Sequence, residues 1–220
     1  MPNHVTNILN APKEVLDALA GLVTDQRWRK GEETRDHEPW GEERDLWTKE
    51  EYQRHSDCDF GKVIPEPENI NREAEGLPAD ANGVLPNGKV SWYWWNTRHW
   101  GTKWNAYDID RRDEAELKFE TAWSHPMPVV KALSQKFPET DIRVRYADED
   151  LGNNLGEYTI RNGEVIEDRS PGKRKREDFA CLLVWGKSYA EYCAERDAEE
   201  EAWEAEQAAK EEAKEAAGRG

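Results

Sequence analysis

The most conspicuous candidates for ligand chemistry are aromatic side chains interleaved with cationic ones in the run SWYWWNTRHWGTKWNAYDID. Tryptophan rings stack on nucleobases, and nearby arginine or lysine side chains neutralise phosphates, so this pattern is typical of a nucleotide or single-stranded nucleic-acid site. Residues 92–112 carry a local charge of +2 within an acidic chain. The residues that we predict to form such a site are Trp94, Trp95, Arg98, His99, Trp100, Lys103 and Trp104.

The alternative is that these tryptophans fill the core of a domain that is poor in aliphatic residues. The sequence has 11 Trp, while the hydrophobic residue types make up only 36% of it. Buried Trp side chains contribute large areas to a core, and any exposed one would anchor a protein interface. The spacing also predicts that Trp100, Trp104 and Tyr107 share one helical face, although Gly101 interrupts it. Both interpretations are open from the sequence.

A second candidate surface is the acidic C-terminal segment. Residues 191–220 contain 11 acidic and four basic side chains, a local charge of −7, and are rich in strong helix formers. A negative helix of this kind resembles the charge of a nucleic acid and would fit a basic groove on a partner. The predicted contacts are Glu199, Glu200, Glu201 and Trp203, and the alternative is a helix that is merely solvated.

Familiar catalytic and metal-binding motifs are missing from the sequence. Its five histidines and three cysteines show no HxH, HxxH, HExxH or CxxC spacing, and there is no P-loop, nucleophile elbow or dinucleotide fingerprint. We therefore expect no metal or cofactor and no catalytic residues. A hydrolase stays open as a further function class if the fold brings His99 or His125 to Asp148 or Glu149. Otherwise His125, which precedes a proline, is expected to cap a helix.

The overall charge limits the partners. The chain has 220 residues and a formal net charge of −16, and a second acidic stretch, residues 32–59, carries −7. Binding duplex DNA by counterion release needs surplus Lys and Arg, so we expect a basic protein partner instead. There is no apolar window long enough to cross a membrane and no secretory signal, and the odd cysteine count suits a reducing compartment. These features predict a cytoplasmic protein with no membrane partner.

Alternating and helical hydrophobic patterns indicate the elements that must position these groups. Asn162-Gly163 is a strong signal for a two-residue hairpin turn. Pro126 and Pro138 bracket one helix. The expected strands are residues 4–10, 106–109, 117–123, 141–147, 155–161 and 164–167, with an extended piece at 60–67, and the expected helices are residues 12–23, 49–55 and 126–137.

The order of these elements predicts an α+β fold, a ferredoxin-like split βαβ sandwich whose antiparallel sheet has two helices on one face. Only that face would need a core, which explains how a chain with few aliphatic residues folds. The ferredoxin-like domain would span residues 1–167, with an acidic, partly helical insertion at 25–59 and the Trp-rich segment at 92–107. A basic linker and a short apolar segment would follow at 168–186, and an acidic helix at 187–220.

Several pieces of the sequence resemble the YubB ferredoxin-like domain family. They are MPNHVTNIL, FGKVIPEP, the run from Trp95 to Ala106, FETAWSHPMPVVKALSQKFP and YADEDLGNNLGEYTIRNGEV, and together they cover residues 1–24 and 58–166. The resemblance implies a small accessory protein of phages, plasmids and related mobile elements, with no iron–sulfur cluster. It implies no established activity and no site residues. Residues 25–57 and 168–220 lie outside it.

The sequence thus favours a non-enzymatic mobile-element protein that binds and inhibits a host protein in the bacterial cytoplasm. The host protein would have a basic surface and belong to the defence or nucleic-acid-processing factors. The two acidic regions would steer the encounter, and an exposed tryptophan would anchor it. A nucleotide or single-stranded nucleic-acid binding module is the alternative, and an unrecognised hydrolase is the second alternative.

Overall fold

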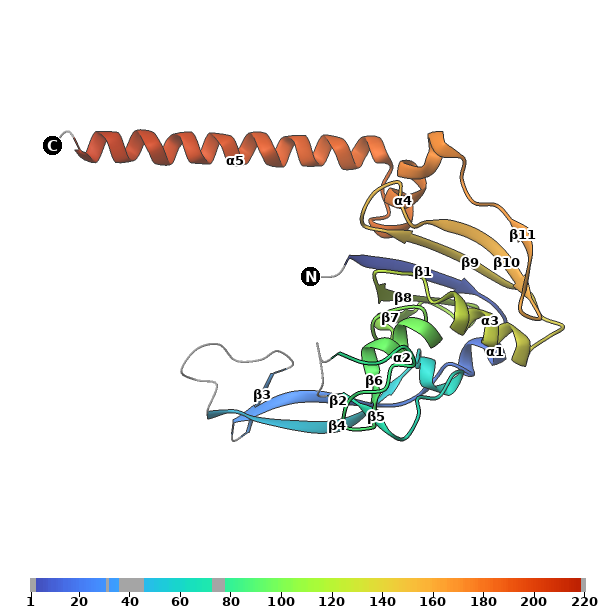
Figure 1. Ribbon diagram of the computed structural model, residues 1–220. Helices are drawn as coiled ribbons and strands as arrows, with labels where there is room; N and C mark the ends of the chain where they lie inside the picture. Colours follow the sequence, from blue (N-terminus) through green and yellow to red (C-terminus); the bar gives the residue numbers. More distant parts are fainter. Residues whose placement is uncertain (1–2, 31, 36–45, 73–77, 219–220) are drawn as a thin grey trace.

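A six-stranded antiparallel sheet forms the centre of the molecule, with strand order β11-β10-β9-β1-β8-β7 (Figure 1). The computed structural model describes residues 3–30, 32–35, 46–72 and 78–218. The strands are β1 (His4–Asn10), β7 (Tyr107–Arg111), β8 (Glu116–Ala122), β9 (Ile142–Asp148), β10 (Gly156–Arg161) and β11 (Glu164–Asp168).

The predicted ferredoxin-like topology is confirmed. The chain runs β1-α1-β7-β8-α3-β9, where α1 is Lys13–Asp17 and α3 is Met127–Lys136, and these four strands lie in the order β9-β1-β8-β7. This is the split βαβ arrangement, because β8 lies between β1 and β7 and β1 lies between β8 and β9. Strand β10 pairs with β9 and extends the sheet beyond it, and the Asn162-Gly163 turn connects β10 to the edge strand β11. Both turn residues have positive φ, 47° and 79°, as this hairpin type requires.

The inner face of the sheet carries the main core. Alternation along β8 and β9 sends every second side chain inward, where α1 and α3 cover them. Phe60 lies at the centre and contacts Trp100 and Phe119 edge to face. The largest contributors are Leu9, Leu16, Phe60, Trp95, Trp100, Leu117, Phe119, Leu133, Ile142 and Ile160.

The outer face is also partly covered, which the expectation of a one-faced core missed. The apolar half of the segment predicted as a linker and short apolar piece forms α4 (Arg176–Val184), after a short 3₁₀ helix at Lys173–Lys175. Ala180 and Leu183 of α4 pack on Ile8 and Ala147 of the sheet and on Leu155, which precedes β10. Ala147 of the sheet and Ala180 of α4 are small, so the helix approaches the sheet closely. The basic run before α4 therefore leads directly into a packed helix.

The insertion is a β-ribbon, and the predicted helix at 49–55 is wrong. Strand β2 (Gly21–Lys30) pairs along nine positions with β4 (Thr48–Ser56), and β3 (Glu33–Arg35) pairs with the end of β2. The predicted helix at 12–23 is correspondingly shortened to α1, and Leu22 and Val23 lie in β2. Pairing between segments that lie far apart in the chain overrides the local helix signals here. Residues 36–45 of the insertion lie outside the described part of the chain.

Short elements connect the ribbon to the Trp-rich segment. Residues 60–67, expected to be extended, begin with a 3₁₀ turn at Phe60–Lys62, where Asp59 Oδ1 accepts a hydrogen bond from the Gly61 amide at 2.9 Å. The two-residue strands β5 (Ile70–Asn71) and β6 (Val90–Ser91) pair in parallel, and α2 (Trp92–His99) follows directly.

The chain ends in the long helix α5 (Tyr189–Gly218), which extends away from the sheet (Figure 1). It meets the body at its first turn, where Tyr192 stacks on Trp185 with ring centres 4.6 Å apart. Lys187 and Glu195 form an ion pair at the same place. No helix in the described part of the chain is both long and apolar enough to span a membrane.

Candidate functional site

Two tryptophans of the Trp-rich segment belong to the main core of the protein. Ser91 caps α2, and the helix ends at His99 with Trp100 as its C-cap, because Gly101 takes a left-handed φ of 81°. Trp95 and Trp100 are buried in the main core, and the Trp100 indole N–H donates to the Ile64 carbonyl at 2.9 Å. The core interpretation is therefore correct for these two residues, which offer no ring face to a ligand.

The other predicted stacking residues are paired within the chain. The His99 ring lies flat on Trp95, with centres 4.5 Å apart, and the Arg98 guanidinium lies 4.8 Å from the centre of the Trp94 ring. Lys103 lies 4.8 Å from the Trp104 ring centre. Trp104 follows the end of α2 and Tyr107 begins β7, so the predicted helical face of Trp100, Trp104 and Tyr107 does not form. The structure therefore buries two of the seven residues, while Arg98 is exposed and Trp94, His99, Lys103 and Trp104 are half-buried.

An exposed aromatic next to this segment was not singled out from the sequence. Trp123, at the end of β8, is 43% exposed and lies 6.3 Å from Tyr93 and 5.1 Å from the Lys103 ammonium. Its φ is +70°, which is strained for a bulky residue. The conformation is held by hydrogen bonds from the Trp123 amide to the Asn3 carbonyl and from Asn154 to the Trp123 carbonyl.

His125 is a buried structural group and does not cap α3. The helix begins after Pro126 without a side-chain cap. His125 lies between Asn7 and Tyr158, its ring nitrogens 2.7 Å and 2.6 Å from the Asn7 oxygen and the Tyr158 hydroxyl, and it stacks on Tyr146. Burial lowers the pKa of His125 to about 3, so the ring is neutral.

The arrangement expected for a hydrolase does not form. Both nitrogens of His125 are occupied as described, and His99 Nδ1 lies 2.9 Å from the Trp95 carbonyl. Asp148 accepts hydrogen bonds from the Asp150 amide and the Asn154 side chain, and Glu149 accepts one from the His4 amide. Neither histidine meets either carboxylate. Among the residues that the structure describes, no three His, Cys, Asp or Glu side chains are placed to hold a metal ion.

The predicted C-terminal contacts are all exposed. The side chains of Glu199, Glu200, Glu201 and Trp203 face solvent, and the Trp203 side chain is 61% exposed. Positions three and four apart share a helix face, so Glu199 and Glu200 lie one turn before Trp203 on its side. Glu206 and Gln207 lie one turn after it. Glu201, two positions away, points to the other side of the helix.

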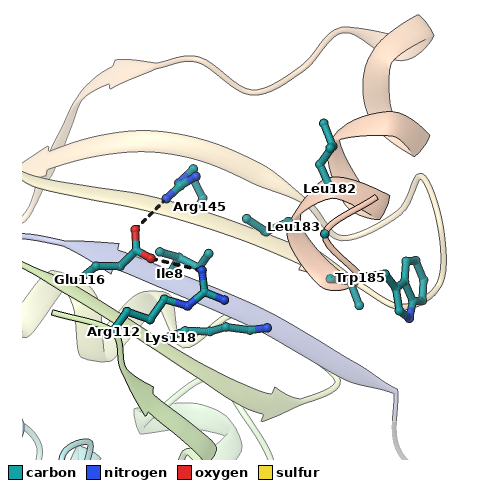
Figure 2. Close-up of a pocket in the computed structure, with 10 residues that line it drawn as sticks. Ile8, Arg112, Glu116, Lys118, Arg145, Leu182, Leu183 and Trp185 are labelled. Atoms are coloured by element: carbon teal, nitrogen blue, oxygen red, sulfur yellow. Dashed lines mark hydrogen bonds and ion pairs between the residues drawn. The ribbon is translucent and has the colours of Figure 1, made fainter. Parts of the chain in front are cut away.

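A groove lies between the outer face of the sheet and the end of α4. Strand pairing places Arg145, Ile8 and Lys118 side by side on three neighbouring strands, because Ile8 is opposite Arg145 in β9 and opposite Lys118 in β8. The groove has a volume of about 380 Å³ (Figure 2). The residues that line it are Ile8, Arg112, Glu116, Lys118, Arg145, Leu182, Leu183, Val184, Trp185 and Gly186.

Charge in this groove is dominated by cations. Glu116 lies 3.3 Å from Arg112 and 3.2 Å from Arg145, and it also accepts a hydrogen bond from Asn10. Lys118 makes no hydrogen bond or ion pair with any described residue. The buried Nε of Arg145 has no partner within the described part of the chain. Sequence reasoning missed this site, although the polar positions of the alternating strands DIRVRYA and LKFETA carry two of its three cations, Arg145 and Lys118.

Comparison with known proteins gives the family. Residues 99–216, more than half of the chain, match the family described as the ferredoxin-like domain in Api92-like protein. The match includes α4 and most of α5, which lie outside the residues that resemble the YubB family. None of the curated proteins is a significant match.

A solved structure shows limited similarity to this chain. It is the crystal structure of a protein api92 from Yersinia pseudotuberculosis, with 21% identity and a TM-score of 0.38. The similarity covers 55% of this chain and 42% of that protein, so the chain spans less than half the length of this relative. On the family match, the chain belongs to the ferredoxin-like domain family of Api92-like proteins.

Proposed function

We propose that this chain is a non-enzymatic protein-binding module that captures a host protein with a basic surface through α5. The observation that carries the proposal is Trp203, a large exposed indole on a helix that extends from the body, with carboxylates on the same side. An exposed indole gains free energy only when another surface covers it. Tryptophan surrounded by a charged rim is a common form of binding hot spot.

The chemistry of α5 defines the partner. A surface that fits it would have an apolar pocket for the Trp203 indole, with Lys or Arg side chains opposite Glu199, Glu200 and Glu206. The acidic helix would steer the encounter electrostatically, which raises the association rate at low salt. Basic surfaces of this kind occur on proteins that handle nucleic acids. Host nucleic-acid-processing or defence factors in the bacterial cytoplasm are therefore the proposed targets, with inhibition as the outcome.

The narrower family assignment is part of the same proposal. The motifs FGKVIPEP and YADEDLGNNLGEYTIRNGEV support a YubB-like member of the ferredoxin-like families, which would make the chain a phage or mobile-element accessory protein. The absence of a catalytic motif from the sequence is consistent with a binding role.

The experiment is quantitative affinity capture from a bacterial host lysate, using the full chain and three variants. Trp203→Ala removes the anchor. The triple variant E199Q/E200Q/E206Q removes three charges from the Trp203 side, and D197N/E201Q/E204Q removes three from the other side as a matched control. We expect capture to fall at least tenfold for the first two and to change less than threefold for the control.

Two results would contradict the proposal. Equal loss in both triple variants would mean that net charge alone, and not the Trp203 side, attracts the captured proteins. Full capture by Trp203→Ala would mean that the indole is not an anchor. Shuffling the order of residues 191–215, which keeps their composition, should abolish capture as well.

A further inference from the structure

The groove between the sheet and α4 contains hydrogen-bond donors that the described chain leaves unused. Lys118 Nζ has no hydrogen-bond or ion-pair partner there, and Arg145 Nε is buried without one. Glu116 is the one acidic side chain among the described residues of the lining, and it already contacts Arg112, Arg145 and Asn10. The Lys118 ammonium is only half-buried and is therefore available to an acceptor oxygen of a ligand, whereas Arg145 Nε has no exposed surface.

The charge of the lining selects an anion. Among the lining residues, Arg112, Lys118 and Arg145 stand against one carboxylate, Glu116, a local surplus of two positive charges within a chain of −16. Asp110, outside the lining, offsets one of them through its ion pair with Arg112 at 3.2 Å. Figure 2 shows the Lys118 side chain extending along the sheet toward the end of α4, beside Arg112. Lysine and arginine together bind phosphate oxygens well, since one supplies a compact charge and the other a fork of donors.

The opposite wall of the groove is apolar and aromatic. It is formed by Leu182, Leu183 and Val184 of α4 and by Trp185, and the Leu182 side chain is 54% exposed. Ile8 lies on the sheet side, between Lys118 and Arg145. One side of the Trp185 ring system stacks on Tyr192, which fixes its orientation. A ligand that fills the groove therefore needs a flat or apolar body joined to its anionic group.

Size and surroundings favour a small ligand over a polymer. A volume of about 380 Å³ lies at the lower end of ordinary small-molecule sites, which begin near about 300 Å³. Acidic groups border the groove, with Asp110 next to Arg112 and Glu195 next to Lys187. A polyanion crossing this rim would meet repulsion, whereas a single phosphate would reach the cations.

From these contacts we infer that the groove binds a nucleoside monophosphate. Lys118 and Arg112 hold the phosphate, and the base lies against Leu182 and Trp185. The proposed ligand contacts lie on the sheet and α4, away from the Trp203 surface of α5 and from the Trp-rich segment. The inference does not depend on the proposed capture of a host protein.

The test is isothermal titration calorimetry of the full chain with AMP, GMP, CMP and UMP. We expect at least one of them to bind, and Lys118→Gln and Arg112→Gln to weaken it at least tenfold each. Lys131→Gln, which removes an exposed charge from α3 on the other side of the sheet, is the matched control and should change affinity less than twofold. Trp185→Leu should weaken binding, and Trp185→Phe should restore most of it.

Comparison ligands test which chemical class of ligand the groove binds. Inorganic phosphate, ribose 5-phosphate and the unphosphorylated nucleosides should each bind at least tenfold more weakly than the best monophosphate. Phosphate binding as tightly as a nucleotide would overturn the role of the apolar wall. Tighter binding of an oligonucleotide or of an acidic peptide would overturn the small-ligand assignment. Absence of any nucleotide binding, or unchanged binding in Lys118→Gln and Arg112→Gln, would overturn the inference entirely.

One control separates this inference from the proposed function. Trp203→Ala should keep full nucleotide affinity, since Trp203 does not line the groove. Lys118→Gln should in turn keep full protein capture. Circular dichroism spectra of all variants, matched to the parent chain, establish that they are folded.

Discussion

His125 Nδ1 lies 2.7 Å from the side-chain oxygen of Asn7, a residue 118 positions earlier in the chain. The Asn7 amide nitrogen donates to the Val5 carbonyl and to Thr121, so its oxygen must be the acceptor. The histidine therefore carries its proton on Nδ1, and Nε2 accepts a hydrogen bond from the Tyr158 hydroxyl. This network joins β1, β10 and the start of α3, and it works only with a neutral ring.

The first prediction is acid destabilisation through His125. Its pKa is about 3 in the folded chain and near the ordinary value of 6.5 when the chain is unfolded, so the unfolded state binds the extra proton between these values. Stability is therefore complete above pH 6.5 and falls as the pH drops toward 3, by about 1.4 kcal/mol per pH unit from this group. Urea unfolding at several pH values should show this slope, and His125→Gln should have a shallower one.

A direct measurement checks the same point without a variant. The imidazole nitrogen NMR shifts of His125 should report a neutral ring protonated on Nδ1 at about pH 4.5, well above the pKa of the folded state. A charged His125 at that pH would contradict the assigned network.

The second prediction concerns the strained backbone of Trp123. Trp123→Ala and Trp123→Gly both lose the contacts with Tyr93 and Lys103, but only glycine relaxes the φ of +70°. We expect the glycine variant to be more stable than the alanine variant by about 1 kcal/mol, the reverse of the usual order. The same pair of changes at Tyr93, inside α2, should keep the usual order, with alanine the more stable.

The third prediction concerns the hairpin glycine. A Cβ at Gly163 would lie 2.6 Å from the Gln135 side chain, and its φ of +79° disfavours any other residue. Gly163→Ala should lower the free energy of unfolding by about 1 to 3 kcal/mol. Gly172 is the matched control, since a Cβ added there would have no atom within 4 Å and its φ is −65°. Gly172→Ala should leave stability within about 0.5 kcal/mol of the parent.

The fourth prediction distinguishes two tryptophans by their surroundings. Trp100 is buried and bonded to the Ile64 carbonyl, so Trp100→Ala should cost about 3 to 5 kcal/mol of unfolding free energy. Trp203 is exposed on α5, so Trp203→Ala should cost less than about 0.5 kcal/mol. Chemical denaturation measures both. A large effect at Trp203 would indicate a contact with the body that the structure does not contain.

Local signals in the sequence predicted the elements that depend on local chemistry. Asn162-Gly163 identified the hairpin because few residue pairs tolerate two positive φ values. Alternation in DIRVRYA and LKFETAW identified two central strands because one of their faces is fully buried. Pro126 and Pro138 identified the limits of α3 because proline is tolerated at the start of a helix but not in its interior. The order of these elements then gave the ferredoxin-like topology.

The failures involve partners far away in the chain. Residues 49–55 are a strand because β2 supplies its hydrogen bonds, and no local window contains that fact. The residues of α4 form a packed helix because Ile8 and Ala147 offer a surface for it. The groove was missed for the same reason, since its cations and Trp185 come together only through strand pairing and helix docking. The Trp-rich run was conspicuous, but its composition alone did not distinguish core from surface.

The length of α5 has an electrical consequence. Trp203 lies 14 residues beyond the start of a helix that rises about 1.5 Å per residue, which places it about 20 Å along the helix. At physiological ionic strength, charges in water are screened over about 8 Å. Salt therefore screens the acidic surface around Trp203 from the cationic groove. A chain with a negative net charge can in this way still present a locally positive site to an anion.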